Sequence, residues 1–280
     1  MYTLKHDYNG TGKGPGLKIA KDYELVDFIE KEIKYGKKSP YAVAEEINQN
    51  RDKFKTEISY KTIYNYIDEG LFPNLTNKDL PVKKQVKKRG YHHIRTAITN
   101  RKGTSISECP REVENRIEYG HWEMDTVVGK QGTKAVLLVL TERKTRQELI
   151  FKMSSKSQKC VVQKLDRLER KMGSKKFRET FKTITCDNGC ENLDYEGIER
   201  SCLTEKARTK VYYAHPYSAW ERGTNENANK LIRRFIPKGA DIRKFSLERI
   251  KMIENWINNY PRRILHGLSS NMLLKQIFVT

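Results

Sequence analysis

Three carboxylates lie in segments whose composition suits metal chemistry. Asp125 follows Trp-Glu-Met, Asp187 precedes Asn-Gly, and Glu226 lies between two asparagines. Carboxylate oxygens are the ligands that Mg²⁺ prefers. If the fold brings the three together, they can hold two divalent ions, the usual apparatus for in-line phosphoryl transfer on nucleic acid. We therefore ask which elements position these acids.

Each acid has a predicted place in an element. Asp125 falls within a strand, where Glu123 points to the same side and the flanking apolar residues to the other. A carboxylate in an otherwise buried strand is costly unless it is paired or metal-bound. Asp187 directly follows a strand and begins a turn, at the strand end where α/β sheets present functional groups; an ordinary Asp-Asn-Gly turn is the alternative. Glu226 falls in the first turn of a helix, where a capping glutamate is the alternative.

Side chains that could bind nucleic acid lie close in sequence to Glu226, the third acid. Lys230 and Arg233 share a helix face with Glu226 and could hold phosphates beside the metal ions. Trp220 and Arg222, just before that helix, are candidates for stacking on a base and holding phosphate, or for ordinary core or interface positions.

The order of elements indicates a shared scaffold. The apolar patterns predict strands over 122–128, 134–141 and 147–153, a helix over 158–172, strands over 181–186 and 210–214, and helices over 224–236 and 246–260. Thr224 is the predicted N-cap of its helix, and Leu247 is predicted to face inward. Three antiparallel strands followed by alternating helices and strands are the order of an α/β ribonuclease-H-like domain of the retroviral-integrase-like kind. This order favours one joint site over three unrelated acids.

Two short helices precede this domain. Ser39, followed by Pro40, is the predicted N-cap of the first, and the second follows from Ser59 and ends at Gly70. Two short helices with a brief polar connector are typical of a helix-turn-helix, whose second helix lies in the major groove, with a helical bundle lacking groove contacts as the alternative. The residues offered to DNA would be Tyr60, Lys61 and Asn65.

The charge predicts a polyanionic partner. The 280 residues include 55 Lys and Arg against 35 Asp and Glu, a net charge of +20. Such an excess favours nucleic acid, because each neutralised phosphate releases counterions. Between 83 and 102 the chain has basic residues and no acid, which predicts an arm along phosphates, with a solvated charge run as the alternative. The contacts expected from it are Lys87, Lys88 and Arg89.

Other classes of protein are disfavoured. No apolar run approaches the ~18 residues of a membrane-spanning helix, and the Gly-rich start is unlike a signal peptide. The five cysteines are irregularly spaced, which indicates reduced thiols rather than a disulfide framework, and no paired cysteines follow His92 and His93 to form a zinc module. We expect a cytoplasmic protein, associated with the nucleoid when bound to DNA, with no membrane partner and no small-molecule substrate.

The segments around the three acids resemble those of DDE transposases of the insertion-sequence-thirty family, which have an integrase catalytic core. The similar segments are GHWEMDTVVG at 120–129, TCDNG at 185–189 and HPYSAWERGTNEN at 215–227. The resemblance covers most of 39–275 and implies that Asp125, Asp187 and Glu226 form the catalytic and metal-binding triad. It also implies two Mg²⁺ ions, with Mn²⁺ as an alternative, cleavage of double-stranded DNA at the element's ends, and strand transfer into target DNA. We further expect a homo-oligomer on DNA.

The combined interpretation divides the chain into four parts. These are a flexible tail over 1–22, a helical DNA-binding domain with the helix-turn-helix over 23–80, a basic linker over 81–112, and the integrase catalytic core with C-terminal helices over 113–280.

Two features depart from the family pattern. The stretch between Asp187 and Glu226 is longer than usual, with the extra length near 201–210, where a loop insertion need not disturb the site. The first residues are a Gly-rich tail where family members have an additional helix-turn-helix. Two alternatives therefore stay open: an inactive or truncated copy acting only as a sequence-specific DNA-binding protein, and a nuclease of the same fold that cuts without joining.

Overall fold

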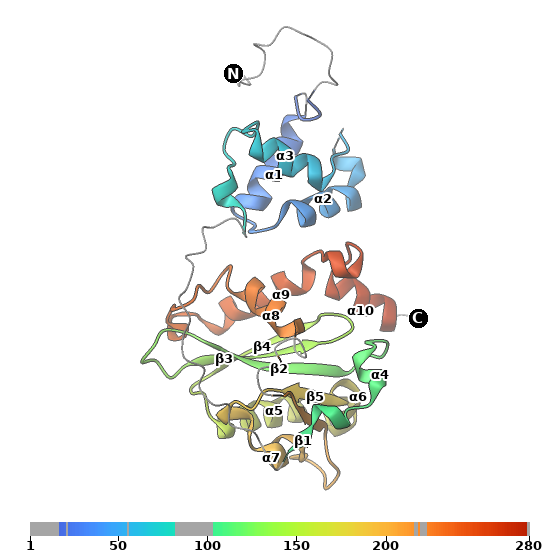
Figure 1. Ribbon diagram of the computed structural model, residues 1–280, viewed down its shortest axis with the longest axis vertical. Coiled ribbons are helices and arrows are strands. Elements are labelled where there is room, and N and C mark those ends of the chain that lie inside the picture. Colours follow the sequence, from blue (N-terminus) through green and yellow to red (C-terminus); the bar gives the residue numbers. More distant parts are fainter. Residues whose placement is uncertain are drawn as a thin grey trace. The chain divides into compact units, whose positions relative to one another are not determined.

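The computed structural model describes residues 17–20, 22–54, 56–81, 103–215, 218 and 223–278. Two compact units are present: Met1–Tyr91 together with Tyr260–Ser269, and His92–Asn259 together with Ser270–Thr280 (Figure 1). The predicted DNA contacts that lie outside the described residues are Lys87, Lys88, Arg89, Trp220 and Arg222.

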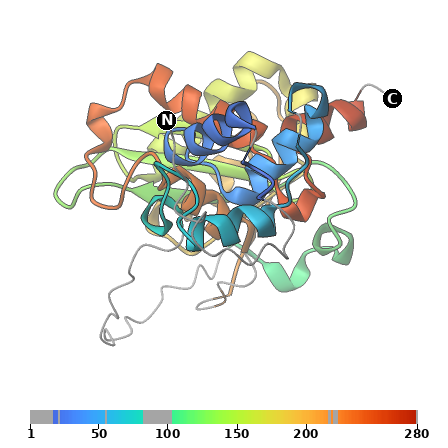
Figure 2. The same ribbon diagram turned by 90° about the horizontal axis from the view of Figure 1, so that it is seen from above.

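The first unit is helical. Its helices are α1 (Tyr23–Lys34), α2 (Pro40–Gln49) and α3 (Tyr60–Asp68), which pack side by side (Figures 1 and 2). The predicted N-cap at Ser39 is confirmed, and Ser59 caps α3 in the same way: each serine accepts a hydrogen bond from the backbone N–H three residues on. Gly70 follows α3 with a φ of 69°, the left-handed conformation that ends helices. The apolar faces meet in one core that includes Leu25, Ile29, Val43, Ile63 and Ile67.

The second unit is a mixed α/β structure. Its elements follow one another as β1 (Thr104–Ser105), α4 (Arg111–Glu114), β2 (His121–Val128), β3 (Val136–Glu142), β4 (Glu148–Met153), α5 (Gln158–Met172), α6 (Ser174–Thr180), β5 (Thr183–Cys186), α7 (Tyr195–Glu199), β6 (Lys210–Tyr213), α8 (Gly223–Ile232), α9 (Leu247–Asn259) and α10 (Ser270–Phe278).

The strands form one six-stranded sheet in the order β1-β6-β5-β2-β3-β4. β2, β3 and β4 are antiparallel neighbours, as the short connections between them predict, whereas β5 runs parallel to β2 and β6 parallel to β5. β1 pairs in parallel with β6 and lies in the stretch predicted as a linker. Its two residues are too few to produce a periodic pattern in the sequence.

Helices cover both faces of this sheet (Figure 1). α5 lies on one face, where Trp122, Met124 and Ile184 join its apolar residues in the core. α8 and α9 contact β2, β3 and β4 on the other face. Since side chains alternate along a strand, Glu123 and Asp125 face α8.

The last long helices differ from the sequence prediction in detail. α8 begins at Gly223, so Thr224 lies inside it and is buried rather than acting as the N-cap. The Thr224 hydroxyl instead accepts a hydrogen bond of 2.7 Å from Arg146, a partner that is distant in sequence. α8 ends at Ile232, four residues before the predicted end at 236. In α9, Leu247 is 64% exposed and does not face the core as predicted.

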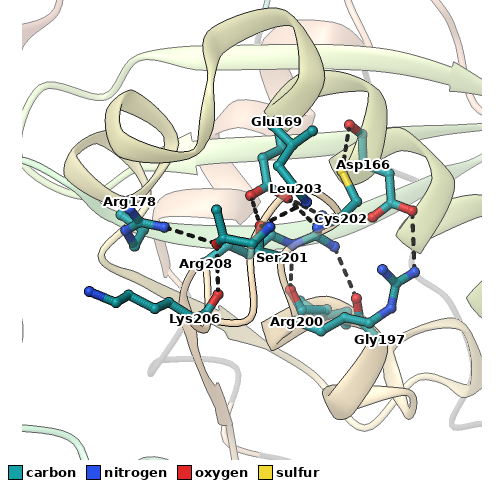
Figure 3. A network of polar contacts seen from close by, with 12 residues as sticks. Asp166, Glu169, Arg178, Gly197, Arg200, Ser201, Cys202, Leu203, Lys206 and Arg208 are labelled. Carbon is teal, nitrogen blue, oxygen red and sulfur yellow. Dashed lines mark hydrogen bonds and ion pairs between the residues drawn. The ribbon is translucent and has the colours of Figure 1, made fainter.

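A buried arginine ties the long connection between Asp187 and Glu226 to α5 (Figure 3). Arg208 donates to Asp166 at 2.7 Å and to Glu169 at 3.2 Å, and its other nitrogens donate to the carbonyls of Ile198 and Gly197. The segment predicted to contain the extra length is thus fixed on the face that α5 covers, opposite to the face that carries Asp125.

Among the helices of the described ranges, none combines the length and the hydrophobicity needed to cross a bilayer.

Candidate functional site

Two of the three predicted acids belong to neighbouring parallel strands: Asp125 lies within β2, and Asp187 directly follows β5. The parallel register of β2 and β5 pairs Trp122 with Ile184 and Glu123 with Thr185. β5 ends at Cys186, so Asp187 follows it directly and lies two residues beyond Thr185, as Asp125 lies two residues beyond Glu123. Because Ile184 is in the core under α5, the alternation of side chains directs Asp187 to the same face as Asp125. The sheet therefore places the two aspartates on or directly after neighbouring parallel strands, and the alternation of side chains predicts the same face for both.

The Asp125 carboxylate is held by α8. Asn229 donates from its side-chain amide to Asp125 Oδ2 at 2.6 Å. One turn earlier on the helix, the backbone N–H of Asn225 donates to Glu123 at 3.1 Å. These two contacts fix α8 over β2, at Glu123 and Asp125.

Asp187 begins a hydrogen-bonded turn. Its Oδ1 accepts from the backbone N–H of Gly189 at 3.0 Å and from the side-chain amide of Asn192 at 2.8 Å. Asn188 donates to the carbonyl of Ala214 at 2.9 Å and joins this turn to the end of β6. The Asp-Asn-Gly turn and the strand-end position are therefore both present.

Glu226 lies on the same helix face as Asn229 but points into solvent. Its side chain is 67% exposed and forms an ion pair of 2.8 Å with Lys230, one turn further on. The hydrogen bond from Lys230 lowers the pKa of Glu226 below its ordinary value. The third acid thus belongs to the helix that contacts Asp125, but it is paired with a cation.

The residues present fit a divalent metal ion by donor type. Asp125 and Asp187 supply carboxylate oxygens on one face. Beside Asp125, the side-chain oxygen of Asn229 is buried and has no hydrogen-bond partner among the described residues, so it is a further oxygen donor. The described side chains nevertheless form no cluster of three or more Asp, Glu, His or Cys arranged for a metal ion, and Glu226 is turned towards Lys230.

Buried polar contacts from the β3–β4 hairpin hold α8, the helix that carries Glu226. Glu123 is fully buried and pairs with Arg143 at 3.3 Å, and Arg146 reaches Thr224 from the same hairpin. An ion pair removed from water needs a close partner, so this arrangement ties the β3–β4 hairpin to α8. Glu123 was predicted to share the side of Asp125, but its arginine partner follows from the hairpin pairing and was not predicted.

The predicted DNA contacts that the structure describes differ in their surroundings. Lys61 and Asn65 are exposed one turn apart on α3, whereas Tyr60 is half-buried, with the Arg263 guanidinium 6.0 Å from its ring centre. Lys230 pairs with Glu226, and Arg233 donates to the carbonyl of Val128 at 2.8 Å. Their role in binding DNA stays a prediction.

Similar proteins are transposases of insertion sequences. The chain is 36% identical over 223 residues, 79% of its length, to a probable transposase for the insertion-like sequence element IS1161 of Streptococcus salivarius. It is 34% identical over 226 residues to the transposase for IS4351 of Bacteroides fragilis, and 31% identical over 236 residues to the transposase InsI for IS30C of Escherichia coli. These matches confirm the resemblance to transposases of the insertion-sequence-thirty type that the motifs indicate.

The similarity is partial in length. The matched regions span 60%, 64% and 58% of these three relatives, so the chain spans about three fifths of their length. No protein-family model matches the chain.

Proposed function

We propose that this chain is a DDE transposase that binds the ends of an insertion sequence and catalyses metal-dependent DNA cleavage and strand transfer. The similarity to transposases over about 80% of the chain supports this class. The sheet order supports a ribonuclease-H-like core, since three antiparallel strands are followed by β5 and β6 parallel to the first of them.

The observation that carries the proposal is the place of Asp125 and Asp187. Asp125 lies within β2, and Asp187 directly follows the neighbouring strand β5. Two carboxylates that meet on one face of the sheet would repel each other unless a cation lies between or beside them. α8 lies over that face and carries Glu226 one turn from Asn229, which contacts Asp125. Rotation of the exposed Glu226 side chain away from Lys230 would turn the third carboxylate to the same site.

When bound, Mg²⁺ or Mn²⁺ would supply the activated oxygen nucleophile at neutral pH and stabilise the leaving oxygen, with two ions in the site. Asp125 and Asp187 would hold the ions, and Glu226 would complete one of the two sites. Asn229 and Asn192 orient the aspartates through their side-chain amides. Lys230, once released from Glu226, would be available for a phosphate of the DNA.

The helical unit would supply sequence recognition. α2 and α3 are short, adjacent and each capped by a serine, which supports the proposed helix-turn-helix with α3 in the major groove. Lys61 and Asn65 on the exposed face of α3 would contact the terminal repeats. Double-stranded DNA is therefore the proposed partner, with the chain acting as a homo-oligomer on it.

An assay of cleavage and joining on the repeat ends of the flanking element tests this function. We expect wild type with Mg²⁺ to nick intact ends and to join precut ends to a target duplex. Asp187→Asn should reduce both reactions at least about 100-fold, as loss of a ligand that fixes the metal does, and keep DNA binding. Full cleavage by Asp187→Asn would refute the assignment of this residue.

The same assay separates the two alternatives. A nuclease of this fold would cut but would not join precut ends. A protein that only binds DNA would retain binding in a chelator and give no product with Mg²⁺.

A further inference from the structure

A cavity of about 770 Å³ lies in the α/β unit, away from the three acids. It is lined by the connection between β2 and β3, the end of β4, one side of α5 and the segment that leads into α9. Its charged lining residues are Lys134, Lys152, Lys164, Arg167 and Arg243, and no acidic side chain of the described residues lines it. Five cations around one cavity without an acid indicate an anionic ligand.

Three of these cations have no carboxylate partner among the described residues: Lys134, Lys164 and Arg167. Lys164 and Arg167 lie three residues apart on α5 and repel each other, and burial together with this repulsion lowers the pKa of Lys164. Like charges held together at a helix surface cost free energy, which an anion placed between them would recover.

The other two cations are held in place. Lys152 donates to the carbonyls of Arg243 and Phe245 at 3.0 and 2.7 Å, and Arg243 pairs with Asp241 at 2.8 Å. These contacts fix the segment before α9 against β4. The cavity wall on this side is therefore fixed before any ligand binds.

The cavity opens at the same edge of the sheet as the aspartates. Val136, the first residue of β3, directly follows the lining residue Ala135 and pairs with Val128, three residues after Asp125 in β2. The start of α5 reaches the turn that follows Asp187, because Gln158 donates to the carbonyl of Cys190 at 3.0 Å and Lys156 pairs with Glu191 at 3.3 Å. A ligand that extends along this edge can contact both places.

We propose that this cationic cavity binds backbone phosphates of the DNA that is held at the three acids. This inference rests on the proposed function and names a second contact region of the same substrate. A duplex presents one charge per about 1.7 Å of its axis, so DNA at the aspartates carries further phosphates past the neighbouring surface. The cations come from four separate segments of the chain, which suits a row of phosphates better than one small anion.

Cys160 provides a reporter inside the cavity. It lines the wall on α5 and is half-buried. Hydrogen bonds from Ser154, Ser155 and Ser157 lower the pKa of this thiol to about 7. A lowered pKa increases the thiolate fraction, so alkylation of Cys160 should rise through pH 7 and be fast at pH 8. DNA in the cavity should slow this reaction.

The test compares two double variants of the full chain that each remove two positive charges from α5. Lys164→Gln with Arg167→Gln alters the cavity, and Arg170→Gln with Lys171→Gln alters exposed residues of the same helix that do not line it. Binding of a fluorescent duplex carrying the repeat end is measured in EDTA from 50 to 300 mM salt. Alkylation of Cys160 by iodoacetamide is followed by mass spectrometry with and without that duplex.

We expect the cavity variant to bind the duplex roughly 10-fold more weakly than the control variant does. The slope of log K against log salt should be smaller by about 1 to 2 for the cavity variant, since each lost phosphate contact removes about 0.9 from the slope. We also expect DNA to protect Cys160 at least about 5-fold in wild type. Lys134→Gln, a change in an exposed side chain, should reduce the slope by about 1 even if the double variant folds poorly.

Equal affinity and slope in the cavity and control variants, with Cys160 unprotected by DNA, would overturn the proposal. Competition by inorganic tripolyphosphate at micromolar concentration, without protection by DNA, would also overturn it in favour of a small anion. The binding assay contains no metal, so a failure of the cleavage chemistry leaves its result unchanged and the two proposals can fail separately.

Discussion

Each aspartate of the candidate site is held by an asparagine. Asn229 comes from a helix above the sheet and Asn192 from the turn after β5. A carboxylate that accepts a hydrogen bond from a positioned amide has fewer rotamers available, which places its oxygens before a metal ion binds. Glu226 is exposed and paired with Lys230, so it would be the mobile member of the triad.

At the same scale, Arg208 should determine the stability of the α/β unit. It is fully buried between Asp166 and Glu169 (Figure 3). Arg208→Met should lower the free energy of unfolding by about 3 to 5 kcal/mol, because two carboxylates lose their buried partner. Urea denaturation followed by circular dichroism measures this.

A matched control comes from the same network. Arg200 pairs with Asp166 at 3.2 Å but its side chain is 51% exposed. Arg200→Met should cost no more than about 1 kcal/mol, since solvent screens the pair. Equal losses in the two variants would show that the buried pair does not carry the stability.

At the scale of elements, the end of β2 is closely packed against the loop that precedes α9. A Cβ on Gly129 would lie 2.5 Å from the carbonyl oxygen of Ala240 and 2.9 Å from Ile242. The next residue, Lys130, donates from its backbone N–H to the same carbonyl at 2.8 Å. Glycine therefore allows β2 and this loop to approach each other.

Gly129→Ala should consequently destabilise the protein by about 1 to 3 kcal/mol, because backbone has to move to admit the methyl group. Gly223→Ala, at the first residue of α8, is the control, since no atom of the described part of the chain lies within 4 Å of its Cβ position. The control should be neutral or slightly stabilising in a helix. Thermal unfolding of both variants measures the difference, and an unchanged melting temperature for Gly129→Ala would contradict the close approach.

The strands and helices that hold the site were largely predictable from local patterns. The alternation around Asp125 predicted its face, and the apolar run before Asp187 predicted its strand end; β2 and β5 confirm both elements. The helix over 158–172 is confirmed at both ends, because Ser157 caps it and Gly173 ends it. Signals of this kind depend only on residues that are neighbours in the sequence.

Contacts between distant segments were not predictable in the same way. The ion pair between Glu226 and Lys230 depends on the side-chain rotamer of Glu226, which the sequence pattern does not determine. The hydrogen bond from Arg146 to Thr224 joins the β3–β4 hairpin to α8, two segments that are distant in the sequence. The cations of the cavity are spread from Lys134 to Arg243 and form no run in the sequence. Only the folded sheet places them around one cavity.

At the scale of the whole molecule, the chain has 55 basic and 35 acidic residues, and the structure shows where part of this excess of positive charge lies. Part of it surrounds a cavity at the edge of the sheet where the aspartates lie. Lys61 on the helical unit adds a charge on the exposed face of α3. This distribution agrees with the proposal that the chain holds DNA at more than one place.

The central claim is that Asp125, Asp187 and Glu226 form one metal site, and metal binding tests it most directly. Bound Mn²⁺ can be counted by electron paramagnetic resonance in the full chain with a duplex of the repeat end. Asp194→Asn is the control, because Asp194 caps α7 in the segment after Asp187 and asparagine caps helices as well. We predict that wild type and Asp194→Asn bind Mn²⁺ equally and that Asp187→Asn loses at least one ion. Unchanged Mn²⁺ binding by Asp187→Asn would contradict the account.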